Sequence, residues 1–117
     1  MKRSMLQVYV NNAAEAIELY KKAFNAEVLW IVPTPQGSIF HSELNIYGQI
    51  LSVADDEANR ETGNTMQFCL DFGEGQEDAV KQAYNALSEG GQILYPLGAC
   101  VFSSLMSDLI DKFGVRW

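Results

Sequence analysis

Few side chains in this sequence have the types and spacing needed for chemistry, and the clearest case is His41, the only histidine. An imidazole can serve as a general base or as a metal ligand near neutral pH. Glu43 follows two residues later, so both side chains would lie on the same face of a strand. A general base needs a nucleophile beside it and a metal ligand needs a second ligand, and neither is evident in the sequence. We therefore favour the interpretation that His41 is a hydrogen-bonding partner of Glu43 or of a neighbouring strand.

Gln67 and Cys69 form a second alternating pair of candidates later in the chain. Cys69 and Cys100 are the only cysteines, and they lack the C-x-x-C spacing of zinc sites and redox motifs. Both lie in apolar, strand-like surroundings, which predicts buried and reduced thiols. Arg116 has a forked guanidinium that could hold an anionic ligand, although a surface ion pair would use it equally well.

Secondary-structure patterns that would position the first candidates fill the first half of the chain. Apolar residues at helical spacing predict a helix from Ala13 to Phe24, with Asn12 and Glu15 as a capping box and Asn25 as its end. Strands are predicted over residues 5–10, 28–32, 38–47 and 50–54.

The second half repeats this order. A polar, acidic stretch, 55–64, reads as a linker between a first module, 1–54, and a second module, 65–117. The second module predicts a helix that begins near Glu77 and ends before Gly90. Its strands are predicted over 65–72, 93–95, 100–106 and 115–117, with a turn at 96–98.

Alternation along the strands predicts one apolar face and one mixed face. The apolar face comprises Leu6, Val8, Val10, Phe40, Leu44, Ile46, Leu51, Val53, Met66, Phe68, Leu70 and Phe72. The mixed face comprises Gln7, Tyr9, His41, Glu43, Asn45, Ser52, Gln67, Cys69 and Asp71. Such a face can simply meet water, or it can line a ligand site.

Composition excludes several classes of function. The net charge is −7, from 15 acidic and 8 basic residues, which argues against nucleic acid and against an anionic membrane surface. No apolar run approaches the ~20 residues that span a bilayer, and the N-terminus lacks the features of a signal peptide. We therefore expect a cytoplasmic protein.

Three segments, taken in this order, resemble the vicinal oxygen chelate (glyoxalase/bleomycin-resistance/dioxygenase) superfamily, and its PhnB-like branch in particular. They are residues 14–27, residues 41–46 with the glycine turn that follows, and the terminal Asp-Lys-Phe-Gly-Val-Arg-Trp. The resemblance implies an α+β fold of two βαβββ modules, with eight strands in one cupped mixed sheet and two helices on its outer face. It also implies a ligand site inside the cup, with His41, Glu43, Gln67, Cys69 and Arg116 as ligand-binding residues.

Metal-dependent members of the superfamily place four ligands at positions that fall here on Met5, near Ser52, on Gln67 and one residue past Trp117. Neither Met5 nor Ser52 suits a hard or borderline divalent cation. We therefore expect no metal and no cofactor, and we favour binding or sequestration of a small organic ligand over turnover. The alternatives are a metal-assisted lyase, isomerase or dioxygenase that uses His41, Glu43 and Gln67, and a cleft that takes a peptide or protein.

We also expect a homodimer, because modules of this kind expose edge strands. The large apolar side chain of Trp117, at the end of a short terminal strand, favours the same expectation, since a partner would bury it.

Overall fold

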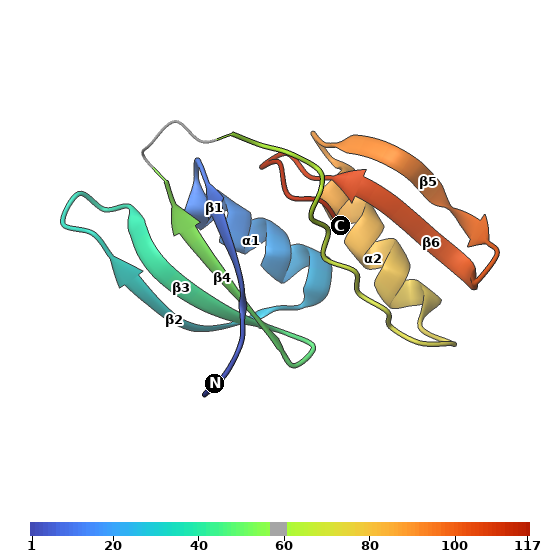
Figure 1. Ribbon diagram of the computed structural model, residues 1–117, viewed down its shortest axis with the longest axis horizontal. Helices are drawn as coiled ribbons and strands as arrows, with labels where there is room; N and C mark the ends of the chain where they lie inside the picture. The colour runs from blue at the N-terminus through green and yellow to red at the C-terminus, as the bar shows by residue number, and fades with distance from the viewer. Residues whose placement is uncertain (57–60) are drawn as a thin grey trace. The chain divides into compact units, whose positions relative to one another are not determined.

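The computed structural model describes residues 1–56 and 61–117 and divides into two compact units, Met1–Glu61 and Thr62–Trp117 (Figure 1). Residues 57–60, in the predicted linker 55–64, lie outside the described residues. Together the units contain two helices and six strands in the described part of the chain, which confirms the predicted α+β class. None of the helices described is long and apolar enough to cross a membrane.

The first unit is a four-stranded mixed sheet with one helix. Its elements are β1 (Leu6–Val10), α1 (Ala13–Phe24), β2 (Glu27–Pro33), β3 (Ile39–Ile46) and β4 (Gln49–Asp55). The spatial order is β1-β4-β3-β2, with β1 parallel to β4 and the other pairs antiparallel. This is the βαβββ order predicted for the first module.

Helix α1 begins and ends where the sequence predicts. The Asn12 side chain accepts a hydrogen bond from the Glu15 N–H at 3.2 Å and donates one to the Glu15 carboxylate at 3.3 Å. Asn25 closes the helix in the left-handed conformation, with φ of 51°. The carboxylate of Asp55, at the end of β4, accepts hydrogen bonds from the backbone N–H groups of Ala13 and Ile39, both at 2.8 Å. Asp55 therefore ties the start of the helix to the start of β3.

The core of the first unit lies between α1 and one face of the sheet. Val10, Leu44, Leu51 and Val53 are fully buried there, as the alternation predicts. The alternation predicts Phe40 on the same buried face, but its side chain is 71% exposed. The reason is a β-bulge: Val32 pairs with His41 and Pro33 with Ile39, so Phe40 is the extra residue.

The tight turn between β3 and β4 falls on Tyr47 and Gly48, one residue earlier than predicted. Both residues have positive φ, 49° and 92°, as a two-residue hairpin turn requires. The Asn45 side chain accepts a hydrogen bond from the Gly48 N–H at 2.7 Å and so fixes the turn.

The second unit contains α2 (Glu77–Ser88), β5 (Gln92–Cys100) and β6 (Ser103–Ile110), and the two strands pair antiparallel. The turn predicted at 96–98 is wrong, because β5 continues through it and the chain turns at Val101 and Phe102. Proline lacks an N–H and is tolerated in a strand at an edge or at a bulge. The pairing of β5 with β6 is indeed irregular here, with register shifts on both sides of the Pro96 segment.

Two predicted strands of the second unit are extended segments with only a few hydrogen bonds. In 65–72, the Phe68 N–H donates to the Arg116 carbonyl at 3.1 Å. In 115–117, Trp117 exchanges two backbone hydrogen bonds with Leu109, at 2.8 and 3.0 Å. These contacts are too sparse to make a continuous ladder, so neither segment is assigned as a strand.

The terminal heptad is a turn built around the buried carboxylate of Asp111. It accepts hydrogen bonds from the Phe113 N–H at 2.8 Å, the Val115 N–H at 3.1 Å and the Trp117 indole at 2.9 Å. Trp117 is only 8% exposed and meets the Phe68 ring edge-on at 5.3 Å. Trp117 therefore needs no dimer partner to cover it, contrary to expectation, because the chain itself buries this side chain.

The β2–β3 hairpin of the first unit and the β5–β6 hairpin of the second have the same pattern of strand pairing. In the first unit Glu27, Val28 and Trp30 pair with Asn45, Leu44 and Glu43. In the second, Gln92, Ile93 and Tyr95 pair with Ile110, Leu109 and Asp108. Every member of the second set lies 65 positions after its counterpart, and both hairpins have an irregularity at the same step. The repeat predicted from pattern is thus present in the pairing of the strands.

Candidate functional site

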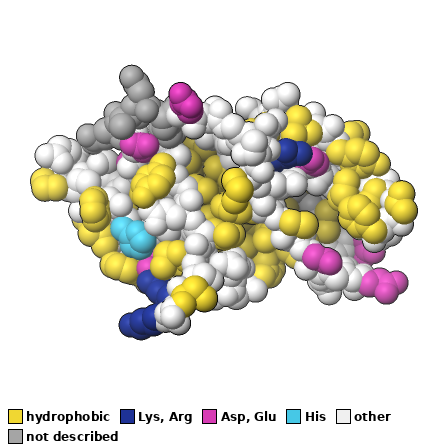
Figure 2. All heavy atoms as spheres, in the orientation of Figure 1, with side chains coloured by type: hydrophobic (Ala, Val, Ile, Leu, Met, Phe, Trp, Pro, Cys, Tyr) yellow, Lys and Arg dark blue, Asp and Glu magenta, His cyan; other side chains and the backbone are white. Residues whose placement is uncertain are grey.

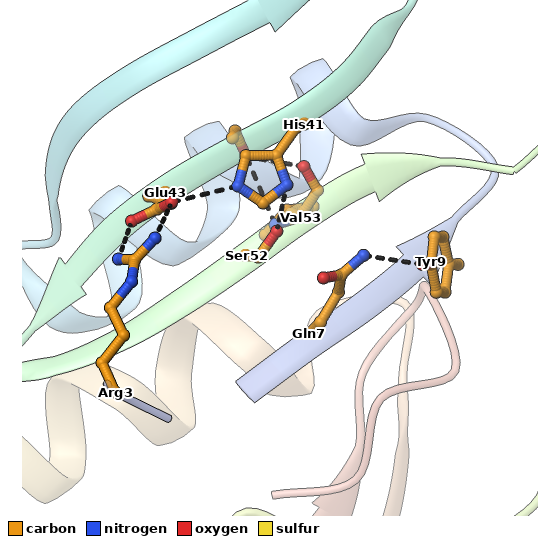
Figure 3. Close-up of polar contacts among 8 residues, drawn as sticks. Arg3, Gln7, Tyr9, His41, Glu43, Ser52 and Val53 are labelled. Atoms are coloured by element: carbon orange, nitrogen blue, oxygen red, sulfur yellow. Dashed lines mark hydrogen bonds and ion pairs between the residues drawn. The ribbon is translucent and has the colours of Figure 1, made fainter. Parts of the chain in front are cut away.

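The chemically capable side chains of the first unit gather on the sheet face opposite to the one that packs on α1. We call this surface the His41 face, and it comprises Gln7, Tyr9, Trp30, His41, Glu43 and Ser52. Strand pairing supports the grouping, because Gln7 lies beside Ser52 and Trp30 beside Glu43. Figure 3 shows Arg3 reaching this face from the segment before β1.

Glu43 is the centre of the face, and Arg3 holds its carboxylate in a two-bonded fork. The two guanidinium nitrogens donate at 2.7 and 3.0 Å. The Glu43 side chain is 3% exposed, whereas that of Arg3 is 51% exposed. Hydrogen bonding from Arg3, followed by that from His41, lowers the pKa of Glu43 from 4.5 to about 2. Glu43 is therefore an anion throughout the ordinary pH range.

His41 links Glu43 to Ser52 (Figure 3). Its Nε2 atom lies 3.1 Å from the Glu43 carboxylate, and its Nδ1 atom lies 3.2 Å from the Ser52 hydroxyl. Because the ionised carboxylate only accepts, Nε2 must carry the proton, and in the neutral ring Nδ1 then accepts from Ser52. Both ring nitrogens are engaged, so His41 is a hydrogen-bonding partner of Glu43 and of the neighbouring strand. This is the interpretation favoured from the sequence over a general base or metal ligand.

The chain Ser52–His41–Glu43 has the connectivity of a serine nucleophile, a base and an orienting acid. Ser52, however, is completely buried in the middle of β4. A nucleophilic oxygen must reach the carbon that it attacks, so Ser52 does not suit this role.

Aromatic surface lies beside these polar groups. The Trp30 ring is 5.3 Å from that of His41, tilted by 59°, and Trp30 is 48% exposed. Tyr9 is 55% exposed, and its hydroxyl accepts a hydrogen bond from Gln7 at 2.7 Å. Figure 2 shows the single histidine at the surface with hydrophobic side chains around it.

The remaining predicted site residues belong to the second unit, and two of them converge on Asp108. Gln67 donates to the Asp108 carboxylate at 2.9 Å, and Arg116 donates through two nitrogens at 3.0 and 2.7 Å. Arg116 also donates to the Asn64 carbonyl at 2.6 Å. Asp108 raises the pKa of Arg116 above its usual value through these hydrogen bonds. Arg116 therefore makes the ion pair considered as one of its two roles.

The prediction that Cys69 is buried is wrong, because this residue is exposed. Its segment lacks the regular strand that would have set its orientation. Cys100 is partly buried, and its thiol lies 3.7 Å from the Met106 sulfur. Both cysteines are free.

Arg3, Trp30 and Asp108 are functional candidates that sequence reasoning did not select. Arg3 has the same odd parity as Gln7 and Tyr9, so strand alternation extended backwards would have placed it on their face. Trp30 lies after the bulge at Leu29, which breaks the alternation of β2. Asp108 would have followed from aligning the two hairpins, but residue identity between the halves is too low to fix the 65-residue offset.

The donor groups of the His41 face do not fit a divalent metal. The Glu43 carboxylate is already paired with Arg3, and a metal cation bound there would be repelled by the guanidinium charge. Met5 and Ser52 supply a thioether and a hydroxyl, which are poor ligands for such ions. In the described residues, no three His, Cys, Asp or Glu side chains come together in a way that could hold a metal ion.

Comparison with known proteins gives the same class as the fold. Residues 3–117 match the model of the Glyoxalase/Bleomycin resistance protein/Dioxygenase superfamily. An uncharacterized protein of Mycobacterium bovis is 40% identical over an alignment of 116 residues, and the match covers 92% of this chain and 75% of the relative. The chain therefore belongs to this superfamily.

Two solved structures show the same fold at low sequence identity. A PhnB protein from Bacillus cereus matches with a TM-score of 0.82 and 24% identity, over 99% of this chain and 96% of that chain. A mutant of the fosfomycin resistance protein FosX from Listeria monocytogenes, complexed with Mn(II) and dihydroxypropylphosphonic acid, matches with a TM-score of 0.73 and 14% identity. That match covers 97% of this chain and 86% of the FosX chain.

Proposed function

We propose that this chain is a PhnB-like protein that binds a small organic ligand on the His41 face without a metal. The observation that carries the proposal is the exposed Trp30 ring beside His41 and the buried Glu43 carboxylate. Apolar and aromatic surface next to a few fixed polar groups is the usual composition of a small-molecule site. Tyr9 extends the aromatic surface on the same face.

Binding is favoured over turnover because the reactive groups of the face are already engaged. His41 has hydrogen bonds at both ring nitrogens, Glu43 is held by Arg3, and Ser52 is buried. Gln67, Cys69 and Arg116 remain predicted ligand-binding residues of the second unit. The cytoplasmic location and the homodimer also remain predictions.

A ligand screen with a matched pair of variants tests the proposal. Compounds that raise the melting temperature of the wild type are measured again, by calorimetry, with Trp30→Ala and Phe102→Ala. Both positions carry exposed aromatic rings, but Phe102 lies at the hairpin turn of the second unit and is 83% exposed. We expect Trp30→Ala to weaken binding about tenfold or more, as loss of a central aromatic contact does, and Phe102→Ala to leave it unchanged. Equal losses in both variants would contradict the proposal.

The FosX structure, which holds Mn(II), favours the metal-assisted alternative. The two functions differ in metal content. We expect the purified and dialysed protein to contain far less than one divalent ion per chain, because the ligand positions hold Met5 and Ser52. About one zinc, nickel, manganese or iron ion per chain would favour the lyase, isomerase or dioxygenase function.

A further inference from the structure

Arg3 lies outside the strands of the sheet, whereas the other members of the site lie on them. It precedes β1, in a segment without regular secondary structure, and residues 1–4 are all exposed. Its guanidinium nevertheless reaches the nearly inaccessible carboxylate of Glu43 with two short hydrogen bonds (Figure 3). An exposed terminal side chain thus covers a buried anion of the sheet.

The buried carboxylate restricts what can take the place of Arg3. An anion that is removed from water and paired with a cation becomes an uncompensated buried charge when that cation leaves, which is costly. A neutral or anionic molecule that displaced Arg3 would leave the Glu43 charge without its cation. A molecule that binds at this carboxylate must therefore bring a positive charge of its own.

Asp108, the counterpart of Glu43 in the second unit, also pairs with an arginine, and that arginine is held by more contacts. Arg116 is bonded to Asp108, its guanidinium also donates to the Asn64 carbonyl, and its own carbonyl accepts from the Phe68 N–H. Arg116 is thus held through both side chain and backbone, whereas the Arg3 side chain, among the described residues, is held by Glu43. Arg116 therefore has anchors beyond its carboxylate that are not described for Arg3.

We infer that Arg3 is a built-in occupant of an organic-cation site, formed by Glu43, Trp30 and His41, and that a ligand with a guanidinium, amidinium or primary ammonium group displaces it. Such a ligand would form the fork with Glu43 and lay its cationic or apolar part against the Trp30 ring. The exchange replaces one cation by another, so the buried charge stays compensated. This inference rests on the proposed function, because it names the ligand class of the His41 face.

Titration with butylguanidinium tests the inference, with neutral butylurea and anionic butyrate as comparison probes. The readout is tryptophan fluorescence, since Trp30 is half exposed and the only other tryptophan, Trp117, is buried. A tethered competitor acts at an effective concentration in the millimolar range, so Arg3→Gln should tighten butylguanidinium binding about tenfold or more. Arg3→Lys, which keeps the charge but loses the fork, should give a smaller gain.

Two further variants locate the effect. Adding Glu43→Gln to Arg3→Gln should abolish the gain. Lys21→Gln, which removes an exposed ion pair with Glu18 on α1, should leave the affinity of the wild type unchanged. Butylurea should bind none of the variants. Circular dichroism establishes that each variant is folded.

Four results would overturn the inference. They are equal or weaker butylguanidinium binding by folded Arg3→Gln, binding of butylurea as strong as that of the cation, butyrate binding that is lost with Arg3, and failure of both Arg3 variants to fold. The last result would mean that Arg3 is a structural partner of Glu43 rather than a replaceable occupant. If butylguanidinium fails while another compound still binds through Trp30, the ligand class is wrong but the proposed function stands.

Discussion

Glu43 and Asp108 occupy equivalent positions in the two units, and each forms an ion pair with two hydrogen bonds to an arginine. The two carboxylates lie 65 positions apart, at the same step of hairpins with the same register. Their arginines are not equivalent, because Arg3 precedes the first strand and Arg116 lies in the terminal segment. The two modules therefore share the carboxylate but obtain the cation from different parts of the chain.

The assignment of the two faces of the first sheet predicts opposite effects at neighbouring residues. Leu44→Ala should cost ~2–5 kcal/mol of stability, because it leaves a cavity in the core against α1. Glu43→Ala should melt much closer to the wild type, because Arg3, its main partner, is half exposed and returns to water. Thermal melts of both variants measure this. If Glu43→Ala melts far below wild type while Leu44→Ala does not, the faces are assigned the wrong way round.

The low pKa of Glu43 predicts a loss of stability in acid. The folded chain keeps this carboxylate ionised down to about pH 2, whereas the unfolded chain takes up a proton near pH 4.5. The stabilising contribution is therefore fully present above about pH 4.5 and is lost as the pH falls towards 2. Glu43→Gln lacks this contribution, so its difference from the wild type in free energy of unfolding should shrink on acidification. A difference that is constant between neutral pH and pH 2 would contradict the ion pair.

The carboxylate of Asp111 should be a main support of the terminal turn. Asp111→Ala leaves buried donors without this acceptor, and each such donor costs ~1–3 kcal/mol. The matched control is Asp71→Ala, because Asp71 is exposed and its carboxylate accepts a single described hydrogen bond, from the Gly73 N–H at 2.9 Å. Urea unfolding should show a large loss for Asp111→Ala and little change for Asp71→Ala. Similar midpoints for the two variants would mean that the turn does not depend on this carboxylate.

Sequence patterns were sufficient wherever local hydrogen bonds or a regular period decide the structure. Helix α1 follows from its apolar stripe, from Asn12 and from Asn25, and the face shared by His41 and Glu43 follows from their spacing. The register of the β2–β3 hairpin depends on bulges at Leu29 and Phe40, which leave no sequence signal that alternation can detect.

Contacts between distant parts of the chain account for the rest. Arg3 and Glu43 are 40 positions apart, and no local rule joins them. The burial of Trp117 likewise depends on Asp111 and on Phe68, which lies 49 positions earlier. The expected strand over 65–72 has the apolar alternation of a strand, but the chain offers it few backbone partners.

Association between two chains remains a prediction that does not depend on Trp117. Strand β2 is an edge of the four-stranded sheet, and it carries Leu29 and Ile31, each with 44% of its surface exposed. Unpaired strand edges with apolar side chains favour pairing with another chain. Light scattering at micromolar concentration should therefore give twice the chain mass of 13.0 kDa. A mass of one chain would contradict the dimer.

The most direct test of the account is the location of ligand binding on the wild-type protein by two-dimensional NMR. A compound that raises the melting temperature is added stepwise to labelled protein, and the shifts of backbone, indole and imidazole signals are followed. The account predicts that the largest shifts fall on Trp30, His41 and Glu43, while Leu44 and the residues of α1 change little. Shifts confined to residues outside the His41 face, with Trp30 and His41 unchanged at saturation, would contradict it.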